Sequence, residues 1–290
     1  MRVHRLGDGP IVRPNMDGRM GDNVNGPSLI RVPDWVTSPL GRYYLYFAHH
    51  DGRYIRLAYA DDLLGPWTTH ELGVLPLADS HFAGHIASPD VLIDDARREF
   101  WLYYHGADHP SRVGNSNQFT RVAVSFDGLR FGARYDRLGA PYFRVFRWDG
   151  WRFAVGMPGI LYRSRDGLTA FEQGPTLFGP DTRHVALDVV GETLRVFYTR
   201  VGDAPERILL STVALTPDWR SWTASGPEIV LEPELPYEGG DLPCEPSRRG
   251  LVDEPVCQLR DPAIFREDGR TYLLYSVAGE RGIAIAALEP

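Results

Sequence analysis

Short runs of alternating apolar and polar residues, separated by glycine, proline and aspartate, make up most of the chain, and no long stretch has apolar residues at helical spacing. This pattern is typical of β-strands joined by tight turns. Residues 260–275 align without a gap on residues 183–198 and 141–156, and an Asp-Gly pair occupies the same columns in the first and last of these segments. Each segment is therefore predicted to be a strand, a tight turn and a returning strand.

Two further copies of this hairpin occur at residues 88–104 and 26–47, where the turns are longer. A third strand follows each hairpin, and a fourth carries the phrase GPTLFGP at 174–180 or GPEIVLEP at 226–233. A related phrase, GPIVRP, occurs at residues 9–14, although no hairpin precedes it. Since the fifth repeat ends without a fourth strand of its own, residues 9–14 are predicted to complete it and close a ring. The sequence thus predicts an all-β chain folded as a five-bladed β-propeller.

The repeats follow one another without an obvious linker, so a single domain is predicted. The predicted blades span about residues 23–80, 85–138, 141–180, 183–233 and, for the fifth blade, 258–290 together with 9–14.

Polar chemistry is concentrated in the loops at one predicted rim of the ring. The loops that enter each inner strand and leave each second strand meet there, and the two longest span residues 105–120 and 231–261. Loops of that length in a compact fold are usually functional or mobile. The spacing of His81 and His85 is that of a metal pair only on a helix, which Gly84 and the following strand disfavour. Seven of the nine histidines fall in or beside these loops: His49, His50, His81, His85, His105, His109 and His184.

All 31 basic side chains are arginine, so the chain contains no lysine. Chemistry that needs an ε-amine is therefore excluded, namely a Schiff base to a carbonyl substrate or to pyridoxal phosphate, a lysine of a phosphate-binding loop and a lysine general base. Carboxylates and histidines remain as proton-transfer groups. The net charge of −7 argues against nucleic acid as a partner, because phosphates require a positive field.

The sequence predicts neither a membrane span nor a signal peptide. No apolar run approaches the length needed to cross a bilayer, and residues 1–10 lack an apolar segment, so the expected location is the cytoplasm. Cys244 and Cys257 could form one disulfide, but two free thiols are the expected state in a reducing compartment. No cofactor is expected, although the histidine-rich rim leaves room for a metal ion.

The five repeats, together with the phrases SPDVLI and RDPAIF, resemble the five-bladed propeller glycosidases, that is, glycoside hydrolase families 43, 62, 117 and 130 and, with an added domain, family 32. The resemblance implies carboxylates at the mouths of the inner strands, one acting as base or nucleophile, one as acid and one tuning a pKa. This chain departs from that pattern. The columns that hold acids in blades one, three and four of family 43 carry Gly26, Tyr142 and His184, and only blade five has an acid there, Asp261.

The candidate catalytic residues are therefore drawn partly from neighbouring positions. Asp22, just before the first inner strand, is the candidate base, and Asp90 occupies the blade-two position of the family motif, where it would tune a pKa or hold a hydroxyl. Glu245 on the long loop is a candidate acid, and His184 is another, similar to the histidine proposed for family 117. The candidate substrate-binding residues share the same rim: Asn25, His49, His85, His105, Tyr142, Arg144, Arg260, Asp261 and Glu238.

The arginines at the mouths of blades three, four and five allow two interpretations. Arg144, Arg183 and Arg260 either grip the carboxylate or sulfate of an acidic sugar through forked hydrogen bonds, or pair with acids of the protein itself. Aromatic residues that repeat at strand spacing, such as Tyr44 and Trp101, are expected to pack between blades.

Three functions remain open for this sequence. The leading hypothesis is a glycoside hydrolase acting on a small oligosaccharide or glycoside, acidic sugars included. The first alternative is a histidine-rich lyase, hydrolase or epimerase of sugars, with or without a metal. The second is a non-catalytic propeller that binds glycans or protein partners. A small carbohydrate is the expected partner, and neither nucleic acid nor a membrane is expected.

Overall fold

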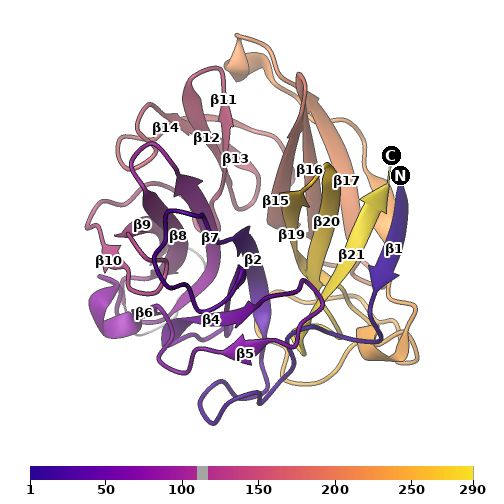
Figure 1. The fold of residues 1–290 in the computed structure, drawn as a ribbon. Helices are drawn as coiled ribbons and strands as arrows, with labels where there is room; N and C mark the ends of the chain where they lie inside the picture. Colours follow the sequence, from indigo (N-terminus) through magenta and orange to yellow (C-terminus); the bar gives the residue numbers. More distant parts are fainter. Residues whose placement is uncertain (110–116, 290) are drawn as a thin grey trace.

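The computed structural model describes residues 1–109 and 117–289, and it confirms the predicted all-β, five-bladed propeller (Figure 1). Blade one contains β2 (Asn25–Arg31), β3 (Tyr43–Ala48), β4 (Tyr54–Ala60) and β5 (Thr68–Thr69), with β6 (Leu75–Pro76) also paired to β4. Blade two contains β7 (Ile86–Asp94), β8 (Glu99–Ala107), β9 (Gln118–Ser125) and β10 (Gly132–Ala133). Blade three contains β11 (Arg144–Trp148), β12 (Trp151–Gly156), β13 (Ile160–Ser164) and β14 (Glu172–Thr176).

The remaining two blades bring the ends of the chain together. Blade four contains β15 (Thr182–Val190), β16 (Thr193–Arg200), β17 (Ile208–Ala214) and β18 (Glu228–Leu231). Blade five contains β19 (Arg260–Glu267), β20 (Arg270–Ser276), β21 (Ile283–Glu289) and, outermost, β1 (Arg2–Leu6). In the residues that the structure describes, three short 3-10 helices lie in connecting loops: η1 (Leu77–Asp79), η3 (Trp219–Ser221) and η4 (Pro236–Glu238). In the described part of the chain, no helix has the length and apolarity needed to cross a bilayer.

The N-terminal segment closes the ring as predicted, but with a different strand. β1 pairs antiparallel with β21 from Arg2 opposite Glu289 to Leu6 opposite Ile285, and the two chain ends lie side by side in Figure 1. The predicted strand at residues 9–14 is therefore corrected to Arg2–Leu6. Prolines interrupt the later segment and cannot donate to a ladder, so only Val12 forms a bridge there, to Ile283.

One apolar cluster fills each of the five gaps between neighbouring blades. Alternate residues of a strand point to opposite faces, so one strand serves two clusters. On β8, Trp101 and Tyr103 pack toward blade three, whereas Phe100 and Leu102 pack toward blade one. The expectation that the repeating aromatics are packing residues is confirmed for these positions.

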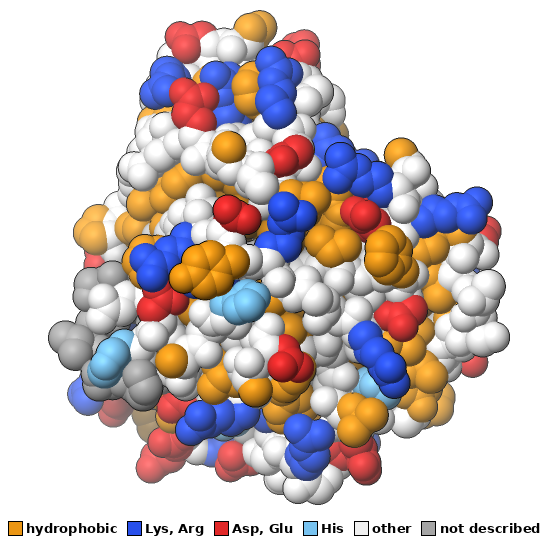
Figure 2. All heavy atoms as spheres, turned by 90° about the vertical axis from the view of Figure 1, so that its left-hand side faces the viewer, with side chains coloured by type: hydrophobic (Ala, Val, Ile, Leu, Met, Phe, Trp, Pro, Cys, Tyr) orange, Lys and Arg blue, Asp and Glu red, His pale blue; other side chains and the backbone are white. Residues whose placement is uncertain are grey.

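The inner strands β2, β7, β11, β15 and β19 contact their neighbours around a closed ring. At the ends of these strands that lie away from the predicted rim, arginines reach acids of the preceding blade. The pairs are Arg147 with Asp94 at 3.6 Å, Arg266 with Asp188 at 2.6 Å and Arg31 with Glu267 at 3.1 Å. Three of the five blade junctions are thus joined by ion pairs at this end. On the face drawn in Figure 2, arginine and acidic side chains are interspersed and form no continuous patch of one sign.

Candidate active site

A backbone irregularity marks the rim end of the inner strands. The ladder shifts register between Asn25 and Ser28 in β2, and equivalent shifts occur in β7, β15 and β19. Such bulges re-aim a side chain and are common beside active sites. These shifts fall at three positions of the family column identified from the sequence, Gly26, His184 and Asp261, and at Ser88 of blade two. The fourth position of that column, Tyr142, lies just before β11. Gly26, Ser88, Tyr142 and Asp261 have positive φ angles of 63°, 48°, 66° and 48°.

Four aromatic rings form a row at this mouth. The ring of Tyr142 lies between those of His105 and His184, with centroid distances of 3.8 and 4.1 Å and interplanar angles of 32° and 34°. His85 meets His105 edge to face at 5.6 Å. The three histidines are buried, and burial lowers the pKa of His85 to about 4 and that of His105 well below its usual value. These imidazoles are therefore neutral at pH 7.

The side chains of His184 on β15 and Asp261 on β19 are buried and in contact with each other. The Asp261 carboxylate binds Nδ1 of His184 and also accepts the Ser276 hydroxyl at 3.2 Å. Burial lowers the pKa of His184 well below its usual value, and the guanidinium groups of Arg183 and Arg144 lower it further.

Asp90 joins blades two and three rather than projecting freely into the channel. Its Oδ2 accepts the backbone N–H of Val145 at 2.8 Å, and Oδ1 lies 3.9 Å from Nη1 of Arg144. Arg144 also donates to the carbonyls of Pro89 and Val185, at 2.5 and 3.2 Å. Burial raises the pKa of Asp90, and Arg144 opposes that shift.

A chain of buried charges runs beneath the mouth of blades four and five. Arg260 is fully buried and lies 3.4 Å from Glu206 and 3.1 Å from Glu280, while Arg183 lies 3.3 Å from Glu206. The arginines proposed as anchors for an acidic sugar are thus engaged with groups of the protein. This agrees with the second of the two interpretations offered by the sequence.

The same network extends to blade one through Glu280. Oε1 of Glu280 lies 3.0 Å from Nδ1 of His50, and Oε2 accepts Nδ2 of Asn23 at 2.6 Å. Asn25, a predicted binding residue, donates to Asn23 at 3.1 Å and so belongs to this network. Burial alone would raise the pKa of Glu280, but the hydrogen bonds and charges of His50 and Arg260 hold it at about 2.

A small cavity of about 50 Å³ lies over these groups. It has room for one or two water molecules, at about 30 Å³ each. Its lining includes both imidazole–carboxylate pairs through His50 and His184, and the full set is His50, His85, Gln118, Tyr142, Met157, Arg183, His184, Arg249 and Gly250.

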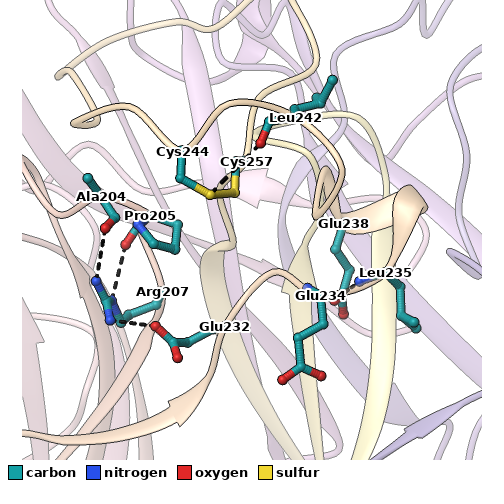
Figure 3. The surroundings of a disulfide bond; sticks show 10 residues. All are labelled: Ala204, Pro205, Arg207, Glu232, Glu234, Leu235, Glu238, Leu242, Cys244 and Cys257. Atoms are coloured by element: carbon teal, nitrogen blue, oxygen red, sulfur yellow. Dashed lines mark hydrogen bonds and ion pairs between the residues drawn. A yellow bond between two sulfur atoms is a disulfide. The ribbon is translucent and has the colours of Figure 1, made fainter.

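The long loop between β18 and β19 covers one side of the cavity. Cys244 and Cys257 form a disulfide within this loop (Figure 3), which corrects the expectation of two free thiols. The loop turns back on itself, so its two cysteines meet with their Cα atoms 5.1 Å apart. Between them, Arg249 donates to the Pro180 carbonyl at 2.8 Å and Arg183 donates to the Arg248 carbonyl, which holds the loop at the mouth.

No protein-family model matches the chain. Over 302 residues, the chain is 37% identical to "Uncharacterized protein R118" of Acanthamoeba polyphaga mimivirus, a match that spans 92% of this chain and 83% of the viral protein. The chain belongs to the R118 family.

Solved structures share the fold of this R118-family member at low identity. A GH43 β-xylosidase/α-arabinofuranosidase from a compost microbial metagenome, in complex with xylotriose, matches with a TM-score of 0.63 and 16% identity over 98% of this chain and 96% of that chain. A GH43_1 enzyme from Xanthomonas citri matches with a TM-score of 0.64 and 14% sequence identity, over 97% of this chain and 92% of that chain. An N-acetylgalactosamine deacetylase from F. plautii, in complex with blood group B trisaccharide, matches with a TM-score of 0.65 and 12% sequence identity, over 99% of this chain and 95% of that chain. These likenesses establish that the R118-family chain has the five-bladed propeller fold of the GH43 glycosidases.

The structure places several predicted site residues outside this cavity. Asp22 is exposed on the rim and forms an ion pair with Arg281, which lowers the pKa of the aspartate. Glu245 is exposed and lines a separate hollow of about 380 Å³ on the outer part of the long loop. His49 is half-buried, and its Nδ1 accepts the backbone N–H of Asp51 at 2.8 Å.

Glu238 has a structural role in this R118-family protein. Its carboxylate is fully buried, pairs with Nε of Arg5 at 2.8 Å and accepts the Tyr275 hydroxyl at 2.9 Å. It also accepts the backbone N–H of Glu234 at 2.9 Å (Figure 3). Through Arg5 and Tyr275 it thus anchors the start of the long loop to β1 and β20. The predicted contact of Glu238 with a substrate is therefore corrected, because its oxygens are occupied and buried.

Sequence reasoning missed His50, Glu280 and Glu206 as members of the site. Each lies in a loop that leaves a second strand, and such loops were assigned to the rim. What the sequence does not show is the pairing, because His50 and Glu280 are 230 residues apart. Within the described ranges, no group of three or more His, Cys, Asp or Glu is arranged to hold a metal ion.

Proposed function

We propose that this chain is a glycoside hydrolase in which His184 and Asp261 form a proton-transfer pair. The observation that carries the proposal is the contact between them at the mouth of the inner strands, beside a cavity of water size. A carboxylate bound at Nδ1 fixes the tautomer and orientation of an imidazole and leaves proton exchange to Nε2. GH43 glycosidases with the same fold lend support, since one of them is described with xylotriose bound.

His184 fits the role of general base better than the acid role inferred from the sequence. Its lowered pKa keeps the ring neutral at pH 7, and a neutral imidazole accepts a proton. In hydrolysis with inversion, the base takes a proton from the water that attacks the anomeric carbon. A water in the cavity beside His184 would occupy that place.

We propose a small neutral sugar as the substrate. Arg144 and Arg260, the predicted anchors for an acidic sugar, are nearly or fully buried and already interact with carbonyls or carboxylates of the protein. Asp90 is then a positioning residue that holds Arg144 and the start of β11 through Val145. Tyr142 and the histidine row supply apolar ring faces and polar edges at the mouth.

The test replaces His184→Gln and, separately, Asp261→Asn. Loss of general base catalysis typically lowers the rate by about 10²–10⁴-fold. We expect His184→Gln to lower kcat/KM within that range, and Asp261→Asn to lower it less because the imidazole remains. The substrates are 4-nitrophenyl β-xyloside, 4-nitrophenyl α-arabinofuranoside, 4-nitrophenyl β-galactoside and xylotriose, with release of nitrophenol or reducing sugar as the readout.

The control His4→Gln removes an exposed histidine on β1, outside the site. It should cleave these glycosides at the wild-type rate. Full activity in His184→Gln would contradict the proposal. A wild-type protein that binds xylotriose in a calorimeter without cleaving any glycoside would instead support the glycan-binding alternative.

A second candidate is a lyase or epimerase that removes a proton from a sugar carbon. The stack of Tyr142 on neutral His184 favours it, because a phenol and an imidazole together could take and deliver a proton at one centre. An ultraviolet-absorbing unsaturated product, or incorporation of deuterium from heavy water into recovered sugar, would identify this reaction. Neither signal accompanies simple hydrolysis.

A further inference from the structure

The cavity that contains His184 is lined by a second imidazole with a carboxylate at the same ring nitrogen. His50 is the second residue after β3, and its Nδ1 lies 3.0 Å from Oε1 of Glu280. The Glu280 side chain is 1% exposed, so this pair is withdrawn from bulk solvent almost as fully as Asp261 and His184 are. His50 and His184 both line the 50 Å³ cavity. The imidazoles of two imidazole–carboxylate pairs therefore line one small cavity.

Glu280 is a permanently charged partner for His50. Nη1 of Arg260 lies 3.1 Å from the carboxylate oxygen that contacts His50, and Asn23 donates to the other oxygen at 2.6 Å. The hydrogen bond and charge of His50, together with Arg260 and Asn23, overcome the effect of burial and hold the pKa of Glu280 at about 2. The carboxylate is thus an anion across the working pH range, held in place by a fully buried guanidinium.

The charged groups around the two imidazoles differ. Next to His184 stand Asp261, the guanidinium groups of Arg183 and Arg144, and the buried ring of His105. Next to His50 stand Glu280, the amide of Asn23, and the neighbouring rings of His49 and His85. Two titratable groups in different surroundings are the usual basis for dividing acid and base roles in one site.

We propose that His50 is the second proton-transfer residue of this site and acts as the general acid, with Glu280 and Arg260 as its positioning residues. This inference rests on the proposed hydrolase function and assigns its missing acid. It also explains why the predicted acids need not reach the cavity: Glu245 lies on the outer part of the loop and Glu238 is buried against Arg5.

Two protons move in the proposed hydrolysis. Nε2 of His184 removes a proton from water, and the water oxygen forms a bond to the anomeric carbon. The bond from that carbon to the leaving oxygen breaks, and the leaving oxygen takes the proton from Nε2 of His50. Solvent then returns a proton to His50 and removes one from His184, so the net reaction consumes one water and releases two hydroxyl compounds.

The experiment compares two leaving groups on whichever sugar the wild-type protein cleaves. The 4-nitrophenyl leaving group departs as a stable phenolate and needs no proton. The methyl leaving group must be protonated to depart as methanol, so only cleavage of the methyl glycoside depends on a general acid. For His50→Gln, we expect kcat/KM on the methyl glycoside to fall by about 10²–10⁴-fold, with less than tenfold loss on the 4-nitrophenyl glycoside. His184→Gln should lose activity on both, and His4→Gln on neither.

The possible outcomes separate the two proposals. The His50→Gln variant is first shown to fold by a circular dichroism spectrum and a melting curve like those of the wild type. If its kcat/KM then falls equally on both substrates, or on neither, the role of His50 is overturned while the proposed hydrolysis stands. A wild-type protein that cleaves no glycoside would overturn the proposed function and the role of His50 with it. If His50→Gln does not fold, Glu280→Gln serves instead, because this substitution keeps the shape of the side chain. It should produce the same dependence of kcat/KM on the leaving group. A folded Glu280→Gln protein without that dependence would contradict the proposal.

Discussion

At the scale of single residues, Gly26 explains why this chain lacks the first acid of the family pattern. Its φ is +63°, and a Cβ built on it would lie 3.1 Å from Cα and 3.3 Å from Oγ of Ser88 on the neighbouring inner strand. A side chain at this position would be crowded by Ser88, in addition to the backbone strain of a positive φ. The close packing of blades one and two therefore disfavours an acid here.

We predict that Gly26→Ala destabilises the protein more than Gly150→Ala does. Gly150 has a similar φ of +72° but nothing within 4 Å of a built Cβ, so it isolates the backbone penalty. That penalty is about 1–2 kcal/mol, and overpacking against Ser88 should add about 1–3 kcal/mol. Urea denaturation of both variants measures the difference. Equal destabilisation would show that the mouth has room for a side chain after all.

At the scale of secondary-structure elements, the inner strands have different roles at their two ends. The rim ends are bulged and carry Tyr142, His184 and Asp261, whereas the opposite ends are regular and joined by ion pairs between blades. Asp188 on β15 is one of these acids and pairs with two arginines, Arg195 of its own blade and Arg266 of blade five.

We predict that Asp188→Asn destabilises the fold by about 1.5–3 kcal/mol, the usual contribution of hydrogen bonds to a charged group. Its side chain is 2% exposed, and two guanidinium groups would lose their counter-charge. The control is Glu172→Gln, whose exposed carboxylate also meets two arginines, Arg163 and Arg220. Exposed pairs contribute about 0–1 kcal/mol. Thermal melting should show a large change for the first variant and a small one for the second.

The strands were predictable because their signals are local. Alternation and Asp-Gly turns act over a few residues, and they located the hairpins, including β19–β20 and β11–β12. The ring-closing strand was misplaced because the phrase at residues 9–14 resembles fourth strands elsewhere, while the selection of Arg2–Leu6 depends on contacts across the ring. The residue pairs of the candidate site likewise depend on contacts across the ring. His50 meets Glu280 and Asp261 meets His184 only after the blades close, and no local pattern encodes those distances.

At the scale of the whole molecule, β1 connects ring closure to the candidate site. It completes blade five, and Arg5 pairs with Glu238 at the start of the long loop whose later residues line the cavity. Glu238 is fully buried, so loss of Arg5 would leave its charge with fewer partners.

We predict that deleting residues 1–6 lowers the melting temperature of the entire ring in a single transition, because all blades depend on closure. Arg5→Met, which removes the ion pair but keeps the strand, should lower it less. Differential scanning calorimetry distinguishes the two. A truncated protein that melts like the full chain would contradict closure by β1.

The repeated bulges also make this propeller a convenient scaffold for altering specificity. Ser88, His184 and Asp261 lie at register shifts of the ladders and Tyr142 lies just before β11, so none of the four takes part in regular strand pairing. A library that randomises these four positions and keeps Gly26 would sample many polar linings on one unchanged architecture. Selection from such a library would exchange one chemistry for another by substitution alone, without redesign of the loops.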